Sequence, residues 1–184
     1  MLTLTEARSL FDARFRRNFW PAPARPQWAL GQLTPDFELP DATYECRRRL
    51  ADYRDRQPVV LAFARIFTAR TYCPLCYPHL IELNRHYPQL QAAGAELLLV
   101  ASTNAEQSRQ VVRDLGLVMP LLSDPRCTSF RAYGVGQALG APLPAQFVLD
   151  ARGRLRYRHL FSFLSPNAGV ERLRQALTDG GTTS

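Results

Sequence analysis

Two of the four cysteines lie three positions apart, in the string Cys73-Pro74-Leu75-Cys76. A short loop separates this pair from an apolar run at residues 58–64 that is typical of a buried strand, and a helical pattern covers residues 73–93. Cys73 is therefore expected where a helix begins, and there the unpaired backbone N–H groups and the helix dipole favour a thiolate. Such positions and C-x-x-C spacing lower a cysteine pKa from about 8.5 to roughly 3.5–7.5. Cys76, one turn further on, can reach the Cys73 sulfur, so the pair predicts two-electron chemistry through a reversible disulfide.

Basic side chains near the pair could assist this chemistry. Arg65 and Arg70 lie close enough in sequence to place a cation beside the sulfur. His79 could assist proton transfer as a neutral imidazole, although a plain structural residue of the helix explains it as well.

Two other interpretations of the cysteine pair stay open. Cys73 and Cys76 could be buried free thiols that pack as small apolar side chains. They could also join His79 in a C-x-x-C-x-x-H metal site, because the three side chains share roughly one helix face. Zinc normally takes a fourth ligand from another segment. The residues that would have to supply it are Cys46, Cys127, His86 and His159.

Strand and helix signals alternate around the pair. The expected strands and extended segments are 58–64, 95–101, 118–122, 146–150 and 155–159, the last two joined as a hairpin. The expected helices are 73–93, 104–115 between Asn104 and Gly116, one that opens at Asp124-Pro125, and 168–177. Pro78 and Pro88 should kink or break the first of these helices. The alternation indicates an α/β protein whose sheet is covered by helices.

The chain divides into three expected parts. Residues 1–26 would form an N-terminal helix and a proline-rich linker, residues 27–178 the α/β domain, and residues 179–184 a flexible tail. Thr3 and Glu6 have the spacing of a capping box. The helix would cover residues 4–19 and pack on the domain, or dock a partner subunit, through Leu4, Ala7, Leu10, Phe11, Phe15 and Phe19.

Composition excludes several classes of function. The net charge is +7, and every basic residue is an arginine. These arginines are scattered apart from Arg47-Arg48-Arg49 and accompany no nucleic-acid motif, so no nucleic-acid partner is expected. We find no stretch long enough to span a bilayer and no signal-peptide core, so a cytoplasmic protein without a membrane partner is expected. Four cysteines are too few for a disulfide scaffold, and in a reducing compartment a close pair is typically catalytic or metal-binding.

The segment Gly31-Gln32-Leu33-Thr34-Pro35-Asp36-Phe37-Glu38-Leu39-Pro40-Asp41 resembles the opening strand motif of peroxiredoxins, the alkyl hydroperoxide reductase/thiol-specific antioxidant family. Similar blocks follow in colinear order to about residue 160: PVVLAFAR, the C-x-x-C helix, GAELLLVAS, MPLLSDP, RAYGV and AQFVLDARGRLRY. The resemblance implies a thioredoxin-like (peroxiredoxin-like) α/β fold, with a central mixed β-sheet flanked by helices and an N-terminal helical extension.

The residues around the pair depart from the P-x-x-x-T-x-x-C signature of typical peroxiredoxins. Ile66 and Arg70 stand at the proline and threonine positions of that signature. The R-x-x-C-P-x-C string from Arg70 to Cys76 instead resembles peroxiredoxin-like proteins with a thioredoxin-style C-x-x-C. Thr68 and Thr71 are nearby, and a one-residue shift could bring either hydroxyl to the sulfur.

The region of Pro144 also differs from typical peroxiredoxins. Pro144 falls where thioredoxin-like proteins carry a cis-proline that faces the catalytic sulfurs. Typical peroxiredoxins have an arginine near that point, so Arg70 or Arg65 would have to replace it.

The resemblance implies a thiol-dependent peroxidase that needs no cofactor. Cys73 would attack hydrogen peroxide or an organic hydroperoxide as a thiolate and become a sulfenic acid. Cys76 would condense with it to a disulfide, and thioredoxin or another dithiol would restore both thiols. Arg70 or Arg65 would stabilise the thiolate and the leaving oxygen, and Thr68 or Thr71 would orient the peroxide. Relatives often dimerise, which by analogy leaves a homodimer open.

Alternative functions remain at this stage. The intact C-x-x-C and Pro144 favour a thiol–disulfide oxidoreductase that acts on protein disulfides. A metal-binding protein of the same fold, such as a copper chaperone of the Sco type, is less consistent with the sequence. Those proteins use C-x-x-x-C and a later histidine, where this chain has Gln146-Phe147. Cys46 and Cys127 are alternative resolving cysteines, although incidental thiols explain both as well.

Overall fold

A mixed β-sheet forms the centre of the protein. The structure is a computed structural model, and it describes residues 13–178. Within these residues the sheet has seven strands in the order β11-β10-β3-β6-β7-β1-β2. In that order they are β11 (Leu155–Leu160), β10 (Ala145–Leu149), β3 (Val59–Ala64), β6 (Glu96–Ala101), β7 (Leu121–Ser123), β1 (Glu38–Asp41) and β2 (Cys46–Arg49). Strands β3, β6 and β7 are parallel, and β10 and β1 run antiparallel to their neighbours, so the mixed sheet is confirmed.

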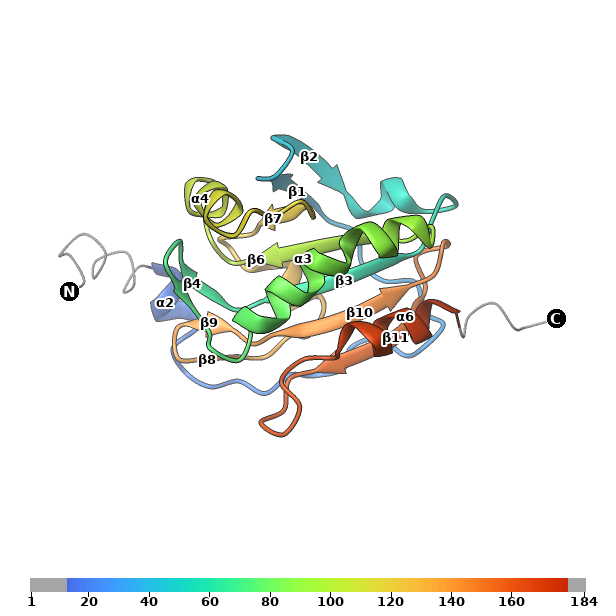
Figure 1. Cartoon of the computed structure of the whole chain (residues 1–184). Coiled ribbons are helices and arrows are strands. Elements are labelled where there is room, and N and C mark those ends of the chain that lie inside the picture. Colours follow the sequence, from blue (N-terminus) through green and yellow to red (C-terminus); the bar gives the residue numbers. More distant parts are fainter. Residues whose placement is uncertain (1–12, 179–184) are drawn as a thin grey trace.

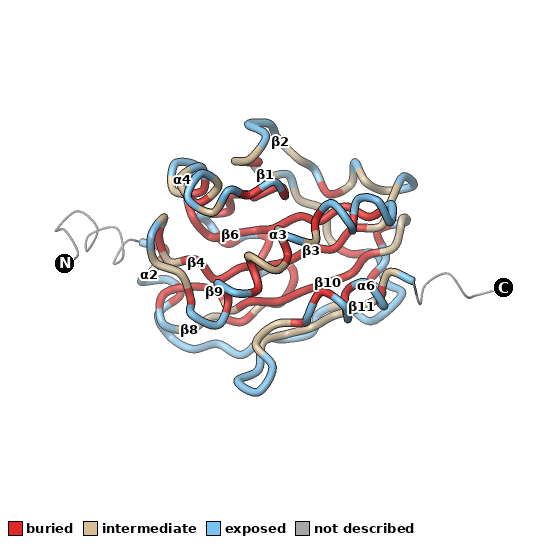
Figure 2. The backbone as a smooth tube through the Cα atoms, in the orientation of Figure 1, coloured by how far each residue is buried: buried red, intermediate tan, exposed pale blue. Residues whose placement is uncertain are grey.

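The middle strands are buried on both faces. Every residue of β3 and of β6 is buried, which explains why both sequences are continuous apolar runs. Figure 2 shows the same pattern, with the strands at the centre of the sheet drawn as buried. Fully burying one such aliphatic or aromatic side chain stabilises the fold by roughly 1.5–3 kcal/mol, so these strands rigidly anchor the loops at their ends.

Helices pack on both faces of the sheet, and Figure 1 shows those on the near face. Four of them follow the strands in the chain: α3 (Tyr77–Ala92), α4 (Ala105–Leu115), α5 (Thr128–Ala132) and α6 (Val170–Thr178). On one face, Leu80 of α3 and Leu173 of α6 join a hydrophobic cluster with Ala62 of β3. On the other face, the ring of Phe130 from α5 packs against Phe63 of β3, with centroids 4.8 Å apart.

Local capping signals set the ends of these helices. The Asn104 side chain accepts from the Gln107 N–H at 2.9 Å and the Gln107 side chain accepts from the Asn104 N–H at 3.4 Å, which is a capping box at the start of α4. Gly116 ends α4 in the left-handed conformation at φ 56°. Helix α5 begins later than expected, because the Asp124 carboxylate stands outside it and accepts from the Ser129 N–H at 2.8 Å.

Helix α3 differs from its sequence prediction at its start and at its prolines. It begins at Tyr77, so the turn that holds both cysteines precedes the helix. Pro78 occupies the first turn, where its missing N–H would be unpaired in any case. The helix also runs through Pro88 without a break, which corrects the expectation of a break. Buried Tyr87 and Leu90 pack against the sheet on either side of Pro88 and outweigh the lost hydrogen bond.

The described part of the N-terminal extension contacts the domain through polar groups and through the ring of Phe15, which lies against Gly140. Its described helical part is α2 (Ala13–Arg17), while most of the helix predicted at 4–19, with its capping box, lies outside the described residues. Arg14 and Asn18 are the buried side chains here, whereas Phe15 of the predicted apolar stripe is half-buried. The Arg14 guanidinium donates to the backbone carbonyls of Ile66, Phe67 and Ser102. Its hydrogen bonds to these three backbone carbonyls explain why the Arg14 cation is buried here.

The linker after α2 is extended, as expected from its prolines. Ala22 forms a β-bridge with Gln137, and the Arg25 N–H donates to the Gly134 carbonyl at 2.9 Å. The predicted tail at 179–184 lies outside the described residues.

Several short elements lie between the main ones. They are η1 (Leu50–Tyr53), the β4 (Ile66–Thr68) and β5 (Thr71–Tyr72) hairpin, and the β8 (Gln137–Ala138) and β9 (Ala141–Pro142) hairpin. Edge strand β2 was not expected from the sequence, because the CRRR run shows no apolar alternation and its pairing is made by the backbone with β1.

No helix in the described part of the chain is both long enough and apolar enough to cross a membrane.

Candidate active site

The cysteine pair lies beyond the carboxyl end of central strand β3. The chain leaves β3 at Ala64, makes the β4–β5 hairpin, and returns so that the Cys73 N–H donates to the Arg65 carbonyl at 3.3 Å. This bond fixes Cys73 beside the end of a fully buried strand. The hairpin at residues 66–72 replaces what the sequence indicated only as a loop.

A tight turn brings the two sulfurs together. The Cys73 carbonyl accepts from the N–H groups of Cys76 and Tyr77, at 2.9 and 3.0 Å. Cys76 is the N-cap residue of α3, so both cysteines lie at the helix N-terminus, where the dipole is positive. Both are free thiols in this structure.

Hydrogen bonds and charge make the two cysteines chemically different. The Cys76 thiol donates to the Cys73 sulfur and lowers the pKa of Cys73 to about 6, helped by the backbone N–H groups of Leu75 and Cys76 and by the charge of Arg65. Burial acts in the opposite direction but does not prevail. The same hydrogen bond, together with burial, raises the pKa of the Cys76 thiol. Cys73 is therefore the thiolate at neutral pH, and Cys76 is the protonated neighbour.

Of the two candidate arginines, Arg65 is the one beside the sulfurs. Its buried guanidinium donates to the Ala138 carbonyl at 2.6 Å and lies over the Phe67 ring, 4.9 Å from the ring centre. Burial lowers the pKa of Arg65, and the charges of the two cysteines act against that change. Because an arginine stays protonated in proteins, this site holds a fixed cation. Arg70 instead lies exposed at the turn of the β4–β5 hairpin.

The two threonines belong to the same hairpin. Thr68 is buried and pairs with Thr71 across the hairpin. The Thr68 hydroxyl accepts from the Arg70 N–H at 3.3 Å, which engages it with the hairpin turn. The orientation of a peroxide by either hydroxyl stays a prediction.

Pro144 is buried directly before β10, whose first residue Ala145 pairs with Phe63 near the end of β3. The position is therefore close to Arg65 in the sheet. None of the described peptide bonds is cis, so the analogy with a cis-proline is wrong for this chain. The Leu143 N–H donates to the Gly136 carbonyl at 2.7 Å, and the chain continues in an extended path from β9 into β10.

The described partner of His79 is Glu82. Its Nδ1 lies 3.6 Å from a Glu82 carboxylate oxygen, and burial lowers the pKa of the imidazole. Within residues 13–178 no group of three or more histidine, cysteine or acidic side chains is arranged to hold a metal ion. The C-x-x-C-x-x-H spacing thus does not bring three ligands together.

Cys127 lies on the other face of the sheet from α3. It belongs to the hydrophobic cluster of Phe130, accepts from the Asn18 side chain at 3.7 Å, and has its pKa raised to about 11, chiefly by burial. A protonated thiol on that face is poorly placed to resolve an intermediate on Cys73.

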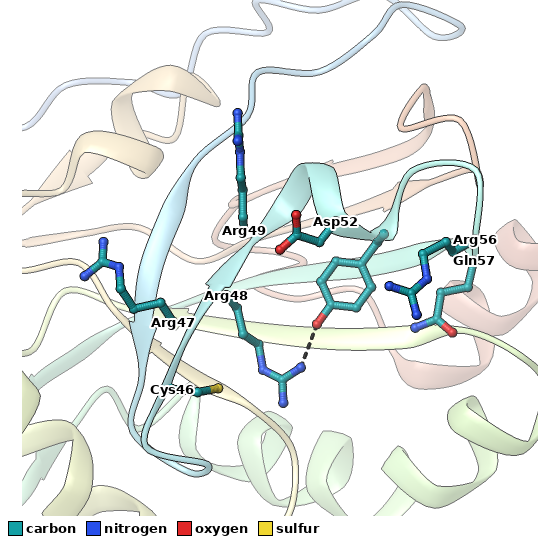
Figure 3. A pocket seen from close by; sticks show the side chains of 8 residues that line it. Cys46, Arg47, Arg48, Arg49, Asp52, Arg56 and Gln57 are labelled. Atoms are coloured by element: carbon teal, nitrogen blue, oxygen red, sulfur yellow. Dashed lines mark hydrogen bonds between the residues drawn. The ribbon is translucent and has the colours of Figure 1, made fainter.

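Cys46 begins edge strand β2, four strand positions from β3, which is about 19 Å across the sheet. It lines a pocket of about 320 Å³ (Figure 3) with Arg47, Arg48, Arg49, Asp52, Tyr53, Arg56 and Gln57. The arginines of β2 are committed to ion pairs with Glu38, Asp41 and Asp36. Arg48 also donates to the Tyr53 hydroxyl at 2.7 Å, and the dashed line in Figure 3 marks this hydrogen bond. This pocket is separate from the cysteine pair.

Sequence reasoning predicted backbone N–H donors at the start of the helix, but it did not identify which residues supply them. The N–H of Leu75 contributes to the acidity of Cys73, yet a backbone group leaves no mark on the residue types. Arg65 carried a signal, because it directly follows the buried strand, but Arg70 lies nearer to Cys73 in the sequence.

Comparison with known proteins shows the family and the fold of this chain. Residues 30–158 match the model of the AhpC/TSA family. The thiol-disulfide oxidoreductase ResA of Geobacillus thermodenitrificans is 32% identical over 70% of this chain and 67% of its own length. A putative peroxiredoxin of Mycobacterium tuberculosis is 29% identical over 68% of this chain and 80% of its own length. The crystal structure of the peroxidoxin BcpB from Mycobacterium tuberculosis has a TM-score of 0.67 at 22% identity, covering 86% of this chain and 100% of that one. The expected peroxiredoxin-like version of the thioredoxin fold is thereby confirmed.

Proposed function

The chain belongs to the AhpC/TSA family, and we propose that it is a thiol-dependent peroxidase that reduces hydrogen peroxide or an organic hydroperoxide. The observation that carries the proposal is the state of Cys73. Its sulfur is ionised at neutral pH beside the Arg65 cation, while the residue is only 9% exposed. A sulfur this enclosed favours a small substrate over a protein. The buried cation suits the negative charge that develops on the leaving oxygen.

In the first step the Cys73 thiolate attacks the terminal oxygen of the peroxide. An S–O bond forms from a sulfur electron pair while the O–O bond breaks. The leaving oxygen departs as hydroxide or alkoxide next to Arg65 and takes a proton from solvent to become water or an alcohol. The sulfur is thereby oxidised by two electrons to sulfenic acid, and the peroxide is reduced by two.

In the second step Cys76 attacks the sulfenic sulfur. The S–O bond breaks, the oxygen leaves as water with the thiol proton of Cys76, and the Cys73–Cys76 disulfide forms. The thiolate of Cys73 is consumed by then, so the hydrogen bond to it that raises the pKa of Cys76 is gone and this thiol ionises more readily.

In the third step a dithiol reductant returns two electrons and two protons and becomes a disulfide itself. We propose thioredoxin or a similar dithiol protein in the cytoplasm, where such dithiols are kept reduced. Leu75 and Tyr77, which are 50% and 42% exposed, offer this partner an apolar contact beside the disulfide.

A thiol–disulfide oxidoreductase is the second candidate. It is favoured by the 32% identity to ResA and by the same exposed side chains, which would meet a protein substrate. In this case Cys73 attacks a protein disulfide, and Cys76 resolves the mixed disulfide.

Rapid mixing of the reduced protein with hydrogen peroxide or an organic hydroperoxide tests the proposal. We expect one equivalent of peroxide to yield the Cys73–Cys76 disulfide, identified by mass spectrometry. Cys73→Ser should be inactive, while Cys76→Ser should react once and stop at the sulfenic acid. A Cys46→Ser, Cys127→Ser double variant is the matched control and should behave as the unsubstituted chain.

The peroxidase proposal fails if the reduced protein reacts with peroxide no faster than its own cysteines in the urea-unfolded chain at the same pH. Fast exchange with a protein disulfide in the same preparation would then establish the second candidate.

A further inference from the structure

Amide groups from three segments form a chain of hydrogen bonds that ends at the cysteine turn. The Ala168 N–H donates to Gln146 Oε1 at 2.8 Å, and Gln146 Nε2 donates to Asn167 Oδ1 at 2.9 Å. Asn167 Nδ2 then donates to the Leu75 carbonyl oxygen at 3.0 Å. That carbonyl shares its peptide unit with the N–H of Cys76. The series of hydrogen bonds therefore continues into the redox turn, which is the turn from Cys73 to Cys76 that brings the two sulfurs together.

The buried end of this series of hydrogen bonds, at Gln146, is rigid. Gln146 lies on β10, opposite Ala62 of β3, and is fully buried. Its amide oxygen and its amide nitrogen both have partners, which fixes the orientation of the side chain. A buried amide without partners would cost several kcal/mol, so this side chain keeps its orientation in the folded protein.

The outer end of this series of hydrogen bonds reaches the backbone N–H groups that donate to the Cys73 thiolate. The N–H of Cys76 points back over the turn and donates to the Cys73 carbonyl at 2.9 Å. The same N–H and that of Leu75 also stabilise the negative charge on the Cys73 sulfur. A hydrogen bond to the carbonyl of a peptide polarises the N–H of the same peptide, and amides bonded in series strengthen one another. All donors in this series point toward Cys73.

We propose that Gln146 and Asn167 are positioning residues of the redox site, which hold and polarise the Leu75–Cys76 peptide so that its N–H stabilises the Cys73 thiolate. The inference rests on the proposed function in that it concerns the reactivity of the same sulfur. It assigns the acidity of Cys73 in part to side chains that lie 70 or more positions later in the sequence.

Asn167→Ala tests the proposal, with Asn84→Ala as its matched control. Asn84 is also a half-buried asparagine that joins two segments, since it donates to the Gly116 carbonyl at 3.1 Å and accepts from the Val118 N–H at 2.8 Å. Both variants lose an asparagine bridge, but only Asn167 is connected to the redox turn.

The readout is the pKa of Cys73, followed by thiolate absorbance during a pH titration of the reduced protein in which Cys46 and Cys127 are serine. We expect Asn167→Ala to raise this pKa by about half a unit and Asn84→Ala to leave it unchanged. The rate with peroxide should then fall about twofold near pH 6 and stay unchanged near pH 8, where the thiol is fully ionised in both proteins.

An equal Cys73 pKa in the two variants would overturn the proposal. Gln146→Leu provides a second measurement at the buried end and should raise the pKa in the same direction. The difference in the Cys73 pKa between the Asn167 and Asn84 variants tests whether Gln146 and Asn167 are positioning residues. The rate at which the unsubstituted protein reacts with peroxide tests the proposed function. The two can therefore fail separately.

Discussion

The stabilisation of negative charge that we propose for Arg65 depends on the buried position of its guanidinium. Its guanidinium is buried beside the Cys73 sulfur and fixed by the Ala138 carbonyl and the Phe67 ring. A fixed, partly desolvated cation stabilises developing negative charge far better than a solvated one, because the surrounding dielectric is lower.

We therefore expect Arg65→Met to raise the pKa of Cys73 and to lower the rate constant with peroxide at neutral pH by about tenfold to 100-fold. Arg70→Met is the matched control and should change the rate less than about twofold, because that side chain is exposed at the hairpin turn. Rapid mixing with peroxide measures both. A larger loss of rate in the Arg70 variant than in the Arg65 variant would indicate that Arg70, and not Arg65, is the catalytic arginine.

In the proposed reaction the thiol of Cys76 has a role before it resolves the sulfenic acid. Its hydrogen bond is the largest single cause of the low pKa of Cys73. Cys76→Ala should therefore raise the pKa of Cys73 from about 6 toward the ordinary value, seen by titration of thiolate absorbance. Cys76→Ser keeps a hydroxyl donor and should give a smaller rise. An unchanged pKa in the alanine variant would contradict the hydrogen-bond assignment.

At the scale of elements, α3 is the support of the redox turn. The turn leads directly into this helix, and the buried side chains Leu80, Leu83, Tyr87 and Leu90 hold the helix on the sheet. The two prolines of α3 differ in how much they destabilise the helix. Pro78 lies in the first turn, where no N–H partner exists, while Pro88 removes a hydrogen bond from the interior.

Pro88→Ala should stabilise the protein by about 1–2 kcal/mol, because the recovered helical hydrogen bond outweighs the added freedom of the unfolded chain. Pro78→Ala, its matched control, should not stabilise the protein. Urea unfolding of both variants measures the change. If Pro78→Ala gained as much as Pro88→Ala, position within the helix would not explain the effect.

At the scale of the molecule, the ionised sulfur couples redox state and pH to stability. The pKa of Cys73 is about 6 in the folded protein and about 8.5 in an unfolded chain. Between these values the unfolded chain binds more protons, so the free energy of unfolding rises with pH. Below pH 6 this contribution is absent, because the thiol is protonated in both states.

We expect the reduced protein to gain about 2–3 kcal/mol from about pH 6 to about pH 8.5, measured by urea unfolding. Above that range Cys76 opposes a further gain, because its pKa is raised in the folded protein and its thiol ionises on unfolding. Cys73→Ser should lack this gain. If the serine variant showed the same rise with pH, other groups would be responsible for it.

The order of the main strands and helices was predicted from the sequence. Continuous apolar runs marked β3 and β6, and Asn104 and Gly116 marked both ends of α4, because these signals act within one element. Edge strand β2 was not predicted. Its arginines are positioned by backbone pairing with β1 and by ion pairs to other segments, and neither contact can be read from the CRRR run itself. The uninterrupted course of α3 through Pro88 also depended on packing with other elements.

The sequence by itself was enough to identify Cys73 and Cys76 as the proposed redox pair, because they are local neighbours at a strand-to-helix junction. Only the tertiary structure decided which arginine faces the sulfur, that Cys46 and Cys127 lie elsewhere, and that Gln146 and Asn167 reach the turn. Spacing along the chain governs contacts within one turn or hairpin. Contacts between distant segments depend on how the sheet orders its strands and on which face each side chain leaves.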